Sequence, residues 1–301
     1  MYIFAGGTVS QVASKYTVAL GLAAQSPVFG ATIQALAADD EYIYVGGVAP
    51  GQLRTYNLSD MSLALPGLTY GGSVWGIEVD DLYAYVVGGV TETIRRYLKT
   101  DLSYIDESIG YGGTIVDIVI DDTHIYIGGS TTTRVQKFLK ADLSYLTQSP
   151  VYGGPIWALA QDDTHIYCGG ATTQRILRYL KADLSFVDQS PVYGGLIRAI
   201  VVDDTHVFAA GATTRTVRRY LKTDLTYVDQ SANYGGDIYA LVQDDDFVYA
   251  GGLITNRDRK YRKSNMAYIG QAPDYGGPIN ALVMIPWREP TVQTNPATEV
   301  T

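Results

Sequence analysis

Short apolar runs alternate with polar, turn-forming residues along the chain, and the alternation repeats every 41 residues. In one copy, runs rich in Ile, Val, Tyr and Thr occupy 197–202, 207–210 and 216–222, and a fourth extends from 225 towards 232. Such runs, bounded by Gly, Asp and Ser, are typical of strands joined by hairpins. The third run also fits a helical stripe, but it is short, lacks a convincing cap and precedes a turn. We therefore expect a strand there.

Tyr-Gly-Gly triplets mark the period, and Phe29-Gly30-Ala31 stands one step before the first of them. The triplets start at Tyr70, Tyr111, Tyr152, Tyr193, Tyr234 and Tyr275. A period of about 20–50 residues indicates a solenoid, a propeller or an array, and four strands per unit favour a propeller blade. We therefore expect an all-β fold over residues 1–287, a seven-bladed β-propeller of four-stranded blades.

The copies begin and end within a unit, because Met1–Gly7 matches a second strand and Pro278–Ile285 matches a first strand. A closed ring explains why the repeat boundaries are offset from the ends of the chain. The C-terminal strand would pair with the N-terminal strands, which leaves no free blade edge. An open solenoid would need distinct capping repeats, and the end copies show none. The remaining segment, 288–301, is rich in Pro and Thr and is typical of an extended arm. We expect this arm to dock on another chain.

The unit resembles the repeats of known β-propellers. A double glycine ends the second strand, as in Ile127-Gly128-Gly129, and an Arg/Lys-Tyr/Phe-Leu-Lys stretch follows. This layout is similar to that of kelch repeats, which also have a Trp in a place where this chain has Tyr104, Tyr145, Phe186 and Tyr227. The WD dipeptide and the Gly-His of WD repeats are absent. The resemblance covers residues 1–287 and implies architecture only, because one propeller fold hosts many functions.

Composition narrows the function classes. The net charge of −9 disfavours nucleic acid, whose binding depends on Lys and Arg at phosphates. A single Cys excludes an internal disulfide, and no apolar stretch approaches the length of a membrane helix. The first residues carry repeat sequence without the basic and apolar regions of a signal peptide, so we expect none. The compartment stays open, with a virion or extracellular assembly favoured over the cytoplasm.

Candidate reactive residues recur at equivalent places instead of converging, so we predict no catalytic residues, metal site or cofactor. His124, His165 and His206 share one slot, and we expect them to close a hairpin. Cys168 replaces an apolar residue and is expected to be a buried filler. Six Asp-Asp pairs, from Asp39-Asp40 to Asp244-Asp245, suit tight turns with some Lys and Arg partners better than calcium loops.

The third strand of each unit is basic. We expect these charges to form a solvated face rather than a polyanion site, because they spread around the ring and acidic turns offset them. They are Arg95, Arg96, Lys99, Lys140, Arg178, Lys181, Arg218, Arg219 and Lys222.

One slot breaks the identity of the repeats, five residues after the start of each triplet. The preceding residue is always Ile or Val, and the following one is small in six of seven copies. The slot holds Gln34, Trp75, Val116, Trp157, Arg198, Tyr239 and Asn280. The loop between the second and third strands also varies, and in a blade this loop lies on the same face as the start of the first strand. We call this the varied face.

Trp, Arg and Tyr dominate binding energies at interfaces, and loops on rigid scaffolds commonly carry function. We therefore predict that these seven residues form a binding surface around the channel on the varied face. Relaxed drift, or aromatic rings that fill gaps between blades, would explain the same variation.

The predicted function is non-enzymatic recognition or assembly. We expect a structural or adhesive component of a phage virion or cell-surface assembly, with a protein partner at the varied face and the C-terminal arm. A carbohydrate-binding propeller with repeated sites is the alternative, but it would keep its contact residues alike in every blade. A propeller enzyme is less favoured, because no unique acid, base or metal cluster stands out.

Overall fold

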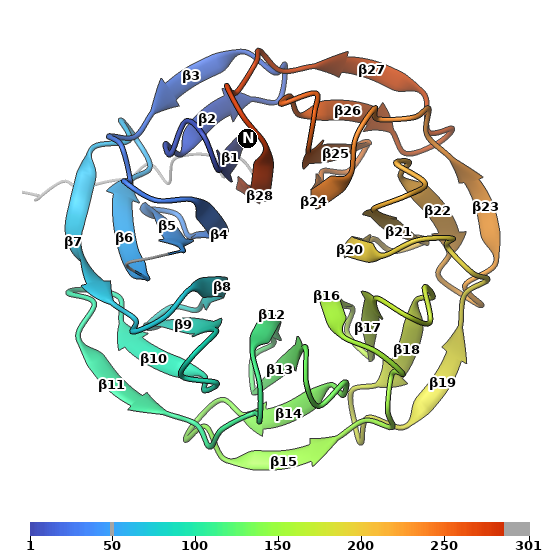
Figure 1. The fold of residues 1–301 in the computed structure, drawn as a ribbon, viewed down its shortest axis with the longest axis horizontal. Coiled ribbons are helices and arrows are strands. Elements are labelled where there is room, and N and C mark those ends of the chain that lie inside the picture. The colour runs from blue at the N-terminus through green and yellow to red at the C-terminus, as the bar shows by residue number, and fades with distance from the viewer. Residues whose placement is uncertain (49–50, 286–301) are drawn as a thin grey trace, which may run out of the picture.

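A computed structural model describes residues 1–48 and 51–285 of the chain. Seven four-stranded antiparallel sheets surround a central channel (Figure 1), which confirms the predicted seven-bladed propeller. The described part has strands and no helix, so no helix in it is suited to cross a membrane. The segment predicted to be an arm, 288–301, lies outside the described residues, as do 286 and 287.

Each blade runs from the channel to the rim in chain order, except that β28 supplies the inner strand of the blade built by β1, β2 and β3. The innermost strands are β4 (Ile33–Ala38), β8 (Val74–Val79), β12 (Ile115–Ile120), β16 (Ile156–Gln161), β20 (Ile197–Val202), β24 (Ile238–Gln243) and β28 (Ile279–Ile285). The second strands are β1 (Tyr2–Gly7), β5 (Tyr42–Gly47), β9 (Tyr83–Gly88), β13 (His124–Gly129), β17 (His165–Gly170), β21 (His206–Gly211) and β25 (Phe247–Gly252).

The outer half of each blade is formed by two further strands, which are shorter than the inner pair except in the blade of β6 and β7. The third strands are β2 (Ser14–Thr17), β6 (Gln52–Asn57), β10 (Arg95–Leu98), β14 (Gln136–Leu139), β18 (Leu177–Leu180), β22 (Arg218–Leu221) and β26 (Arg259–Arg262). The outermost strands are β3 (Leu22–Gln25), β7 (Leu63–Thr69), β11 (Tyr104–Glu107), β15 (Tyr145–Gln148), β19 (Phe186–Gln189), β23 (Tyr227–Gln230) and β27 (Tyr268–Gln271). The segment that also fitted a helical stripe is thus a strand, β22.

The ring closes as predicted. β28 pairs antiparallel with β1, so that Phe4 lies opposite Val283, and the sheet order is β28-β1-β2-β3. The first and last described strands therefore share one blade. Every innermost strand of the described ring pairs with the second strand of its own blade.

Neighbouring blades pack through apolar residues of the two innermost strands, which form a series of buried clusters around the ring. One cluster joins Ala158 and Tyr167 of one blade to Ile197 and Val207 of the next. The first glycine of the second-strand pair permits this approach, because a Cβ on Gly169 would lie 2.6 Å from the Ile197 side chain. Glycine serves this close packing in five of the seven blades, while Val87 and Ala210 occupy the same position in the other two.

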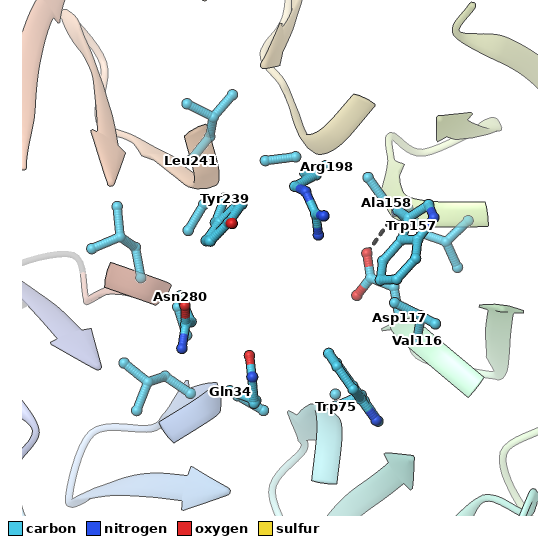
Figure 2. Close-up of a pocket in the computed structure, with 18 of the residues that line it drawn as sticks. Gln34, Trp75, Val116, Asp117, Trp157, Ala158, Arg198, Tyr239, Leu241 and Asn280 are labelled. Carbon is cyan, nitrogen blue, oxygen red and sulfur yellow. Dashed lines mark hydrogen bonds between the residues drawn. The ribbon is translucent and has the colours of Figure 1, made fainter. Parts of the chain in front are cut away.

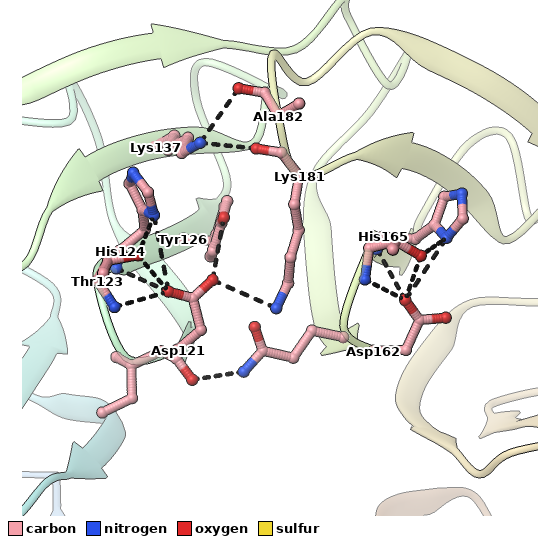
Figure 3. A network of polar contacts seen from close by, with 12 residues as sticks. Asp121, Thr123, His124, Tyr126, Lys137, Asp162, His165, Lys181 and Ala182 are labelled. Atoms are coloured by element: carbon pink, nitrogen blue, oxygen red, sulfur yellow. Dashed lines mark hydrogen bonds and ion pairs between the residues drawn. The ribbon is translucent and has the colours of Figure 1, made fainter.

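The Asp-Asp turns form hairpins, as predicted, and also join the blades (Figure 3). In one turn, Oδ1 of Asp121 accepts the backbone N–H groups of Thr123 and His124 at 2.9 and 2.8 Å. Its Oδ2 accepts the Tyr126 hydroxyl and lies 3.3 Å from Nζ of Lys181 in the next blade. Equivalent ion pairs join Lys99 to Asp39, Lys140 to Asp80, Lys222 to Asp162 and Lys263 to Asp203.

The prediction that the basic third strands form a solvated face is wrong for several of their charges. Arg96, Arg178 and Arg219 are buried and pair with Asp106, Asp188 and Asp229 of the adjacent strand. Arg96 also donates to the Lys140 carbonyl oxygen of the next blade at 3.0 Å. The sequence shows the charges but not this geometry, in which the third strand faces the following blade.

Candidate functional site

The seven varied residues occupy one structural position. Each is the second residue of an innermost strand, and all seven line a single cavity of about 640 Å³ at the end of the channel on the varied face (Figure 2). We call this region the channel mouth. Six of the side chains are half-buried, while Val116 is buried. The structure therefore brings together all the residues that the sequence predicts for binding.

The position is a β-bulge in every blade. In β16, for example, Ile156 pairs with Gly170 and Ala158 pairs with Gly169, so that Trp157 between them has no cross-strand partner. A bulge leaves its extra residue free of the ladder and re-aims its side chain. This geometry explains why the position tolerates Gln, Trp, Val, Arg, Tyr and Asn while both neighbours stay restricted.

The second glycine of each second-strand pair makes the bulge possible. A Cβ on Gly170 would lie 2.0 Å from the carbonyl oxygen of Pro155, which precedes β16, and the other blades are equally tight. The paired glycines therefore serve close backbone approach. Left-handed backbone, with positive φ, occurs instead at the first glycine of each Tyr-Gly-Gly triplet, such as Gly153 with φ 98°.

Two tryptophans form one wall of the channel mouth. The rings of Trp75 and Trp157 meet edge to face with centroids 6.5 Å apart and planes at 77°. They come from blades that are not neighbours, because the blade of Val116 lies between them (Figure 2). The small Val116 side chain leaves the space in which the two indoles meet. The mouth is therefore asymmetric, although the backbone around it is nearly seven-fold.

Arg198 lies between two aromatic rings beside this wall. Its guanidinium carbon is 4.9 Å from the Trp157 ring centroid and 4.6 Å from that of Tyr239. Stacking of this kind is favourable and holds the guanidinium plane in place. Nε of Arg198 is buried without a hydrogen-bond partner among the described residues. Figure 2 shows the guanidinium directed into the channel.

Amide side chains lie on the opposite side of the mouth. Nδ2 of Asn280 donates to Oγ1 of Thr8 at 3.1 Å and to the carbonyl oxygen of Ile33 at 3.0 Å. These two bonds fix the amide so that its oxygen remains available as an acceptor. Gln34 lies next to it across the boundary between two blades (Figure 2). The mouth thus combines an aromatic and cationic half with an amide half.

Two carboxyl groups lie further inside the channel. Burial, with the nearby Asp117 adding to it, raises the pKa of Glu78 to about 8. Burial also raises the pKa of Asp117, to about 7, against the N–H groups of Leu159 and Ile118 that bond its carboxylate. Paired carboxyls with raised pKa values are groups that an acid–base enzyme could use. The prediction that this protein is not an enzyme is therefore tested most directly at Glu78 and Asp117.

Sequence reasoning missed this pair, although the repeats carried a signal for it. Asp117 is the one exception among the small residues that follow the varied slot. Glu78 stands where the other copies have Ala or Val. A departure from a small or apolar consensus at an inner-strand position indicates a side chain in the channel. No hydrogen bond or ion pair satisfies Glu78 among the residues described.

The triplet tyrosines hold the loops of the varied face. The Tyr152 hydroxyl donates to the Arg175 carbonyl oxygen at 2.8 Å, and Tyr193 donates to Thr216 at 2.9 Å. In the six blades that have a triplet tyrosine, the start of the first strand is thereby joined to the loop between the second and third strands. In these six blades the bond ties the varied loop to the rim of the channel mouth.

The remaining candidate residues have structural surroundings. Nδ1 of each histidine lies 2.7 Å from the hydroxyl of the preceding threonine, within the hairpin. Cys168 is fully buried, and burial raises the pKa of its thiol. Within residues 1–48 and 51–285, no group of three or more His, Cys, Asp or Glu residues could hold a metal ion.

Comparisons with known proteins identify the class of fold. No protein-family model matches the chain, and no curated protein matches it. The crystal structure of the computationally designed Ika8 protein is similar at a TM-score of 0.72 and 14% identity, covering 95% of this chain and 91% of the other. The WD40 β-propeller domain of Doa1 is similar at 0.71 and 14%, covering 83% and 84%. The chain is thus a seven-bladed β-propeller repeat protein, and the likeness concerns the fold alone.

Proposed function

We propose that this protein is a non-enzymatic recognition propeller that binds one partner at the channel mouth. In this proposal it serves as a structural or adhesive component of a larger assembly, such as a phage virion or a cell surface. The kelch-like layout of its repeats belongs to the proposal as architecture and adds no ligand. The C-terminal arm, proposed as a second contact, lies outside the described residues, so the argument depends on the mouth.

One observation carries the proposal: seven different side chains converge on one cavity from seven equivalent bulges. Repeats that vary most freely where they face a shared cavity, between two restricted neighbours, are expected when a single asymmetric ligand selects each side chain. Trp75, Trp157, Arg198 and Tyr239 are residue types that supply most of the binding energy at interfaces. Their mutual stacking holds them in place before binding, which lowers the entropy lost when a partner docks.

The carbohydrate alternative requires repeated sites, one in each blade. The aromatic rings of the mouth instead share one cavity, and Val116, Gln34 and Asn280 replace them in the other blades. This arrangement favours one binding event per molecule. A glycan array tests the alternative, because a lectin would bind members of the array and a uniformly negative result would count strongly against it.

The test is a selection of random peptides on the immobilised protein, followed by affinity measurements with variants. We expect Trp157→Ala/Arg198→Ala to weaken the selected peptides at least about tenfold, as loss of interface anchors does. Arg218→Ala/Tyr227→Ala is the matched control. It removes another stacked pair, 5.7 Å apart, from the outer strands β22 and β23. Equal affinity of the mouth variant and the wild type would contradict the proposal.

A further inference from the structure

The guanidinium of Arg198 points into the cavity at the channel mouth. No carboxylate among the described residues forms an ion pair with it, and its only described partners are the rings of Trp157 and Tyr239. The comparable Arg96 and Arg178 each pair with an aspartate of their own blade. A buried or half-buried charge is normally paired. An unpaired one that points into a cavity therefore indicates that its partner is a ligand.

We propose that the channel mouth binds a carboxylate, carried on an aromatic or apolar group, through the guanidinium of Arg198. This inference rests on the proposed recognition site and names the chemistry that the site takes. The carboxylate would accept two parallel N–H bonds from the guanidinium edge, and its carrier would pack on the Trp75 and Trp157 rings.

The geometry of Arg198 favours a planar ligand group. The Trp157 and Tyr239 rings lie on either side of the guanidinium, and its N–H groups are directed into the channel (Figure 2). An arginine edge presents N–H groups in a fork that matches the two oxygens of a carboxylate. The edge-to-face indoles next to it provide an apolar wall for the carrier. The free oxygen of Asn280 and the Gln34 amide, across the cavity, suit polar groups at the other end of the ligand.

A phosphate would also match the guanidinium fork, but the channel carries an argument against it. Glu78 and Asp117 lie below the mouth, and Glu78 is three residues further along β8 than Trp75, about 10 Å along the strand. Asp117 and Glu78 ionise around and above their raised pKa values of about 7 and 8, and in that pH range a doubly negative ligand would be repelled by their carboxylates. A singly charged carboxylate experiences less of that repulsion.

The experiment titrates small probes against the indole signals of Trp75 and Trp157. A Trp287→Phe background leaves these as the two tryptophans of the chain. The probes are benzoate, uncharged benzamide and phenyl phosphate. The dipeptide Gly-Phe is titrated with a free and with an amidated C-terminus. This comparison shows whether the site accepts the C-terminal carboxylate of a peptide as well as that of a small molecule. For a ligand as small as benzoate we expect a Kd on the order of 1–10 mM.

We expect benzoate to bind at least about tenfold more tightly than benzamide or phenyl phosphate, and Arg198→Met to remove this preference. Arg198→Gln serves as a second variant in case one of them unfolds. Arg218→Met is the matched control, because Arg218 also stacks between two rings, at 5.1 and 5.7 Å, but on β22. Its benzoate affinity should equal that of the wild type.

Two results would overturn the carboxylate inference. Either benzamide or phenyl phosphate binds as tightly as benzoate, or Arg198→Met leaves benzoate affinity unchanged. In both cases the recognition site itself is judged separately, by whether the selected peptides depend on the mouth. Loss of that dependence would remove the proposed function and this inference together.

Discussion

At the scale of the residue, the molecule is informative where one copy departs from the others. Asp258 is fully buried in a position where equivalent blades have Ile94, Val135, Ile176 or Val217. Neither of its carboxyl oxygens has a hydrogen-bond partner among the described residues. The serine that usually accepts the backbone N–H at this position, Ser231 for Val217 at 3.0 Å, is replaced by Ala272. Burial raises the pKa of Asp258 to about 7.

Asp258→Val should stabilise the protein, and more so as the pH rises. In the folded wild type the pKa of Asp258 is about 7, whereas the ordinary pKa of an aspartate, taken for the unfolded chain, is 3.8. The folded state therefore holds a proton that the unfolded state releases, and stability falls as pH rises between these values. The variant's advantage in unfolding free energy should grow by about 3–4 kcal/mol between pH 4 and pH 8. Urea unfolding of both proteins at the two pH values measures this difference, and an advantage independent of pH would contradict it.

At this scale the sequence predicted some of the functional side chains and missed the surroundings of others. The seven varied residues follow from comparison of the repeats alone. Asp117 and Asp258 also stand out as departures, but a linear repeat does not tell a channel-facing position from one between blades. The partners of Arg96 and Arg178 depend on which way a third strand faces. That direction is set by packing against the next blade.

At the scale of the element, the strand boundaries follow from the apolar pattern, whereas the bulges do not. A bulge appears in the sequence only as a tolerated slot between two restricted ones. The turn after each third strand is a second departure from local preference. Leu184 has a φ of 58°, in the left-handed region that usually holds Gly, Asn or Asp. Its side chain is buried. Burial of leucine therefore outweighs the backbone preference, which sequence rules for turns do not capture.

Gly170→Ala tests the role of the bulge. The added Cβ would lie 2.0 Å from the Pro155 carbonyl oxygen, so β16 or β17 must shift. We expect a loss of about 2–3 kcal/mol in unfolding free energy, as for overpacked cores, together with a changed Trp157 fluorescence. Gly110→Ala is the matched control, because no atom lies within 4 Å of its added Cβ. Denaturant unfolding with fluorescence detection measures both. Equal stabilities of the two variants would exclude a requirement for close approach at Gly170.

At the scale of the whole molecule, the ring is held by closure at β28 and by contacts repeated between blades. The Asp-Asp turns were predicted, with some basic partners. That each lysine reaches back to the preceding blade was not, because it depends on the spacing between blades. Burial would raise the pKa of Asp121, but the N–H groups of Thr123 and His124 and the ammonium of Lys181 lower it to about 2.

Lys181→Met should destabilise the ring at neutral pH and not in strong acid. A carboxylate with a lowered pKa contributes stability above its unfolded value, and that contribution is lost as pH falls towards about 2. We expect a loss of about 1 kcal/mol at pH 7 that disappears near pH 2. Thermal unfolding across this range measures it. Arg262→Met is the control, because Arg262 is exposed and has no ion pair among the described residues. A Lys181 effect of the same size at pH 2 would rule out the ion pair as its source.

The central claim is that the seven bulge residues form one recognition site at the channel mouth. The most direct measurement is a crystal structure of the protein with its tightest selected peptide. The account predicts a peptide seated over Trp75 and Trp157, with a carboxylate at the Arg198 guanidinium. A peptide bound on the Asp-Asp turns or the outermost strands, with no contact to the mouth, would contradict it.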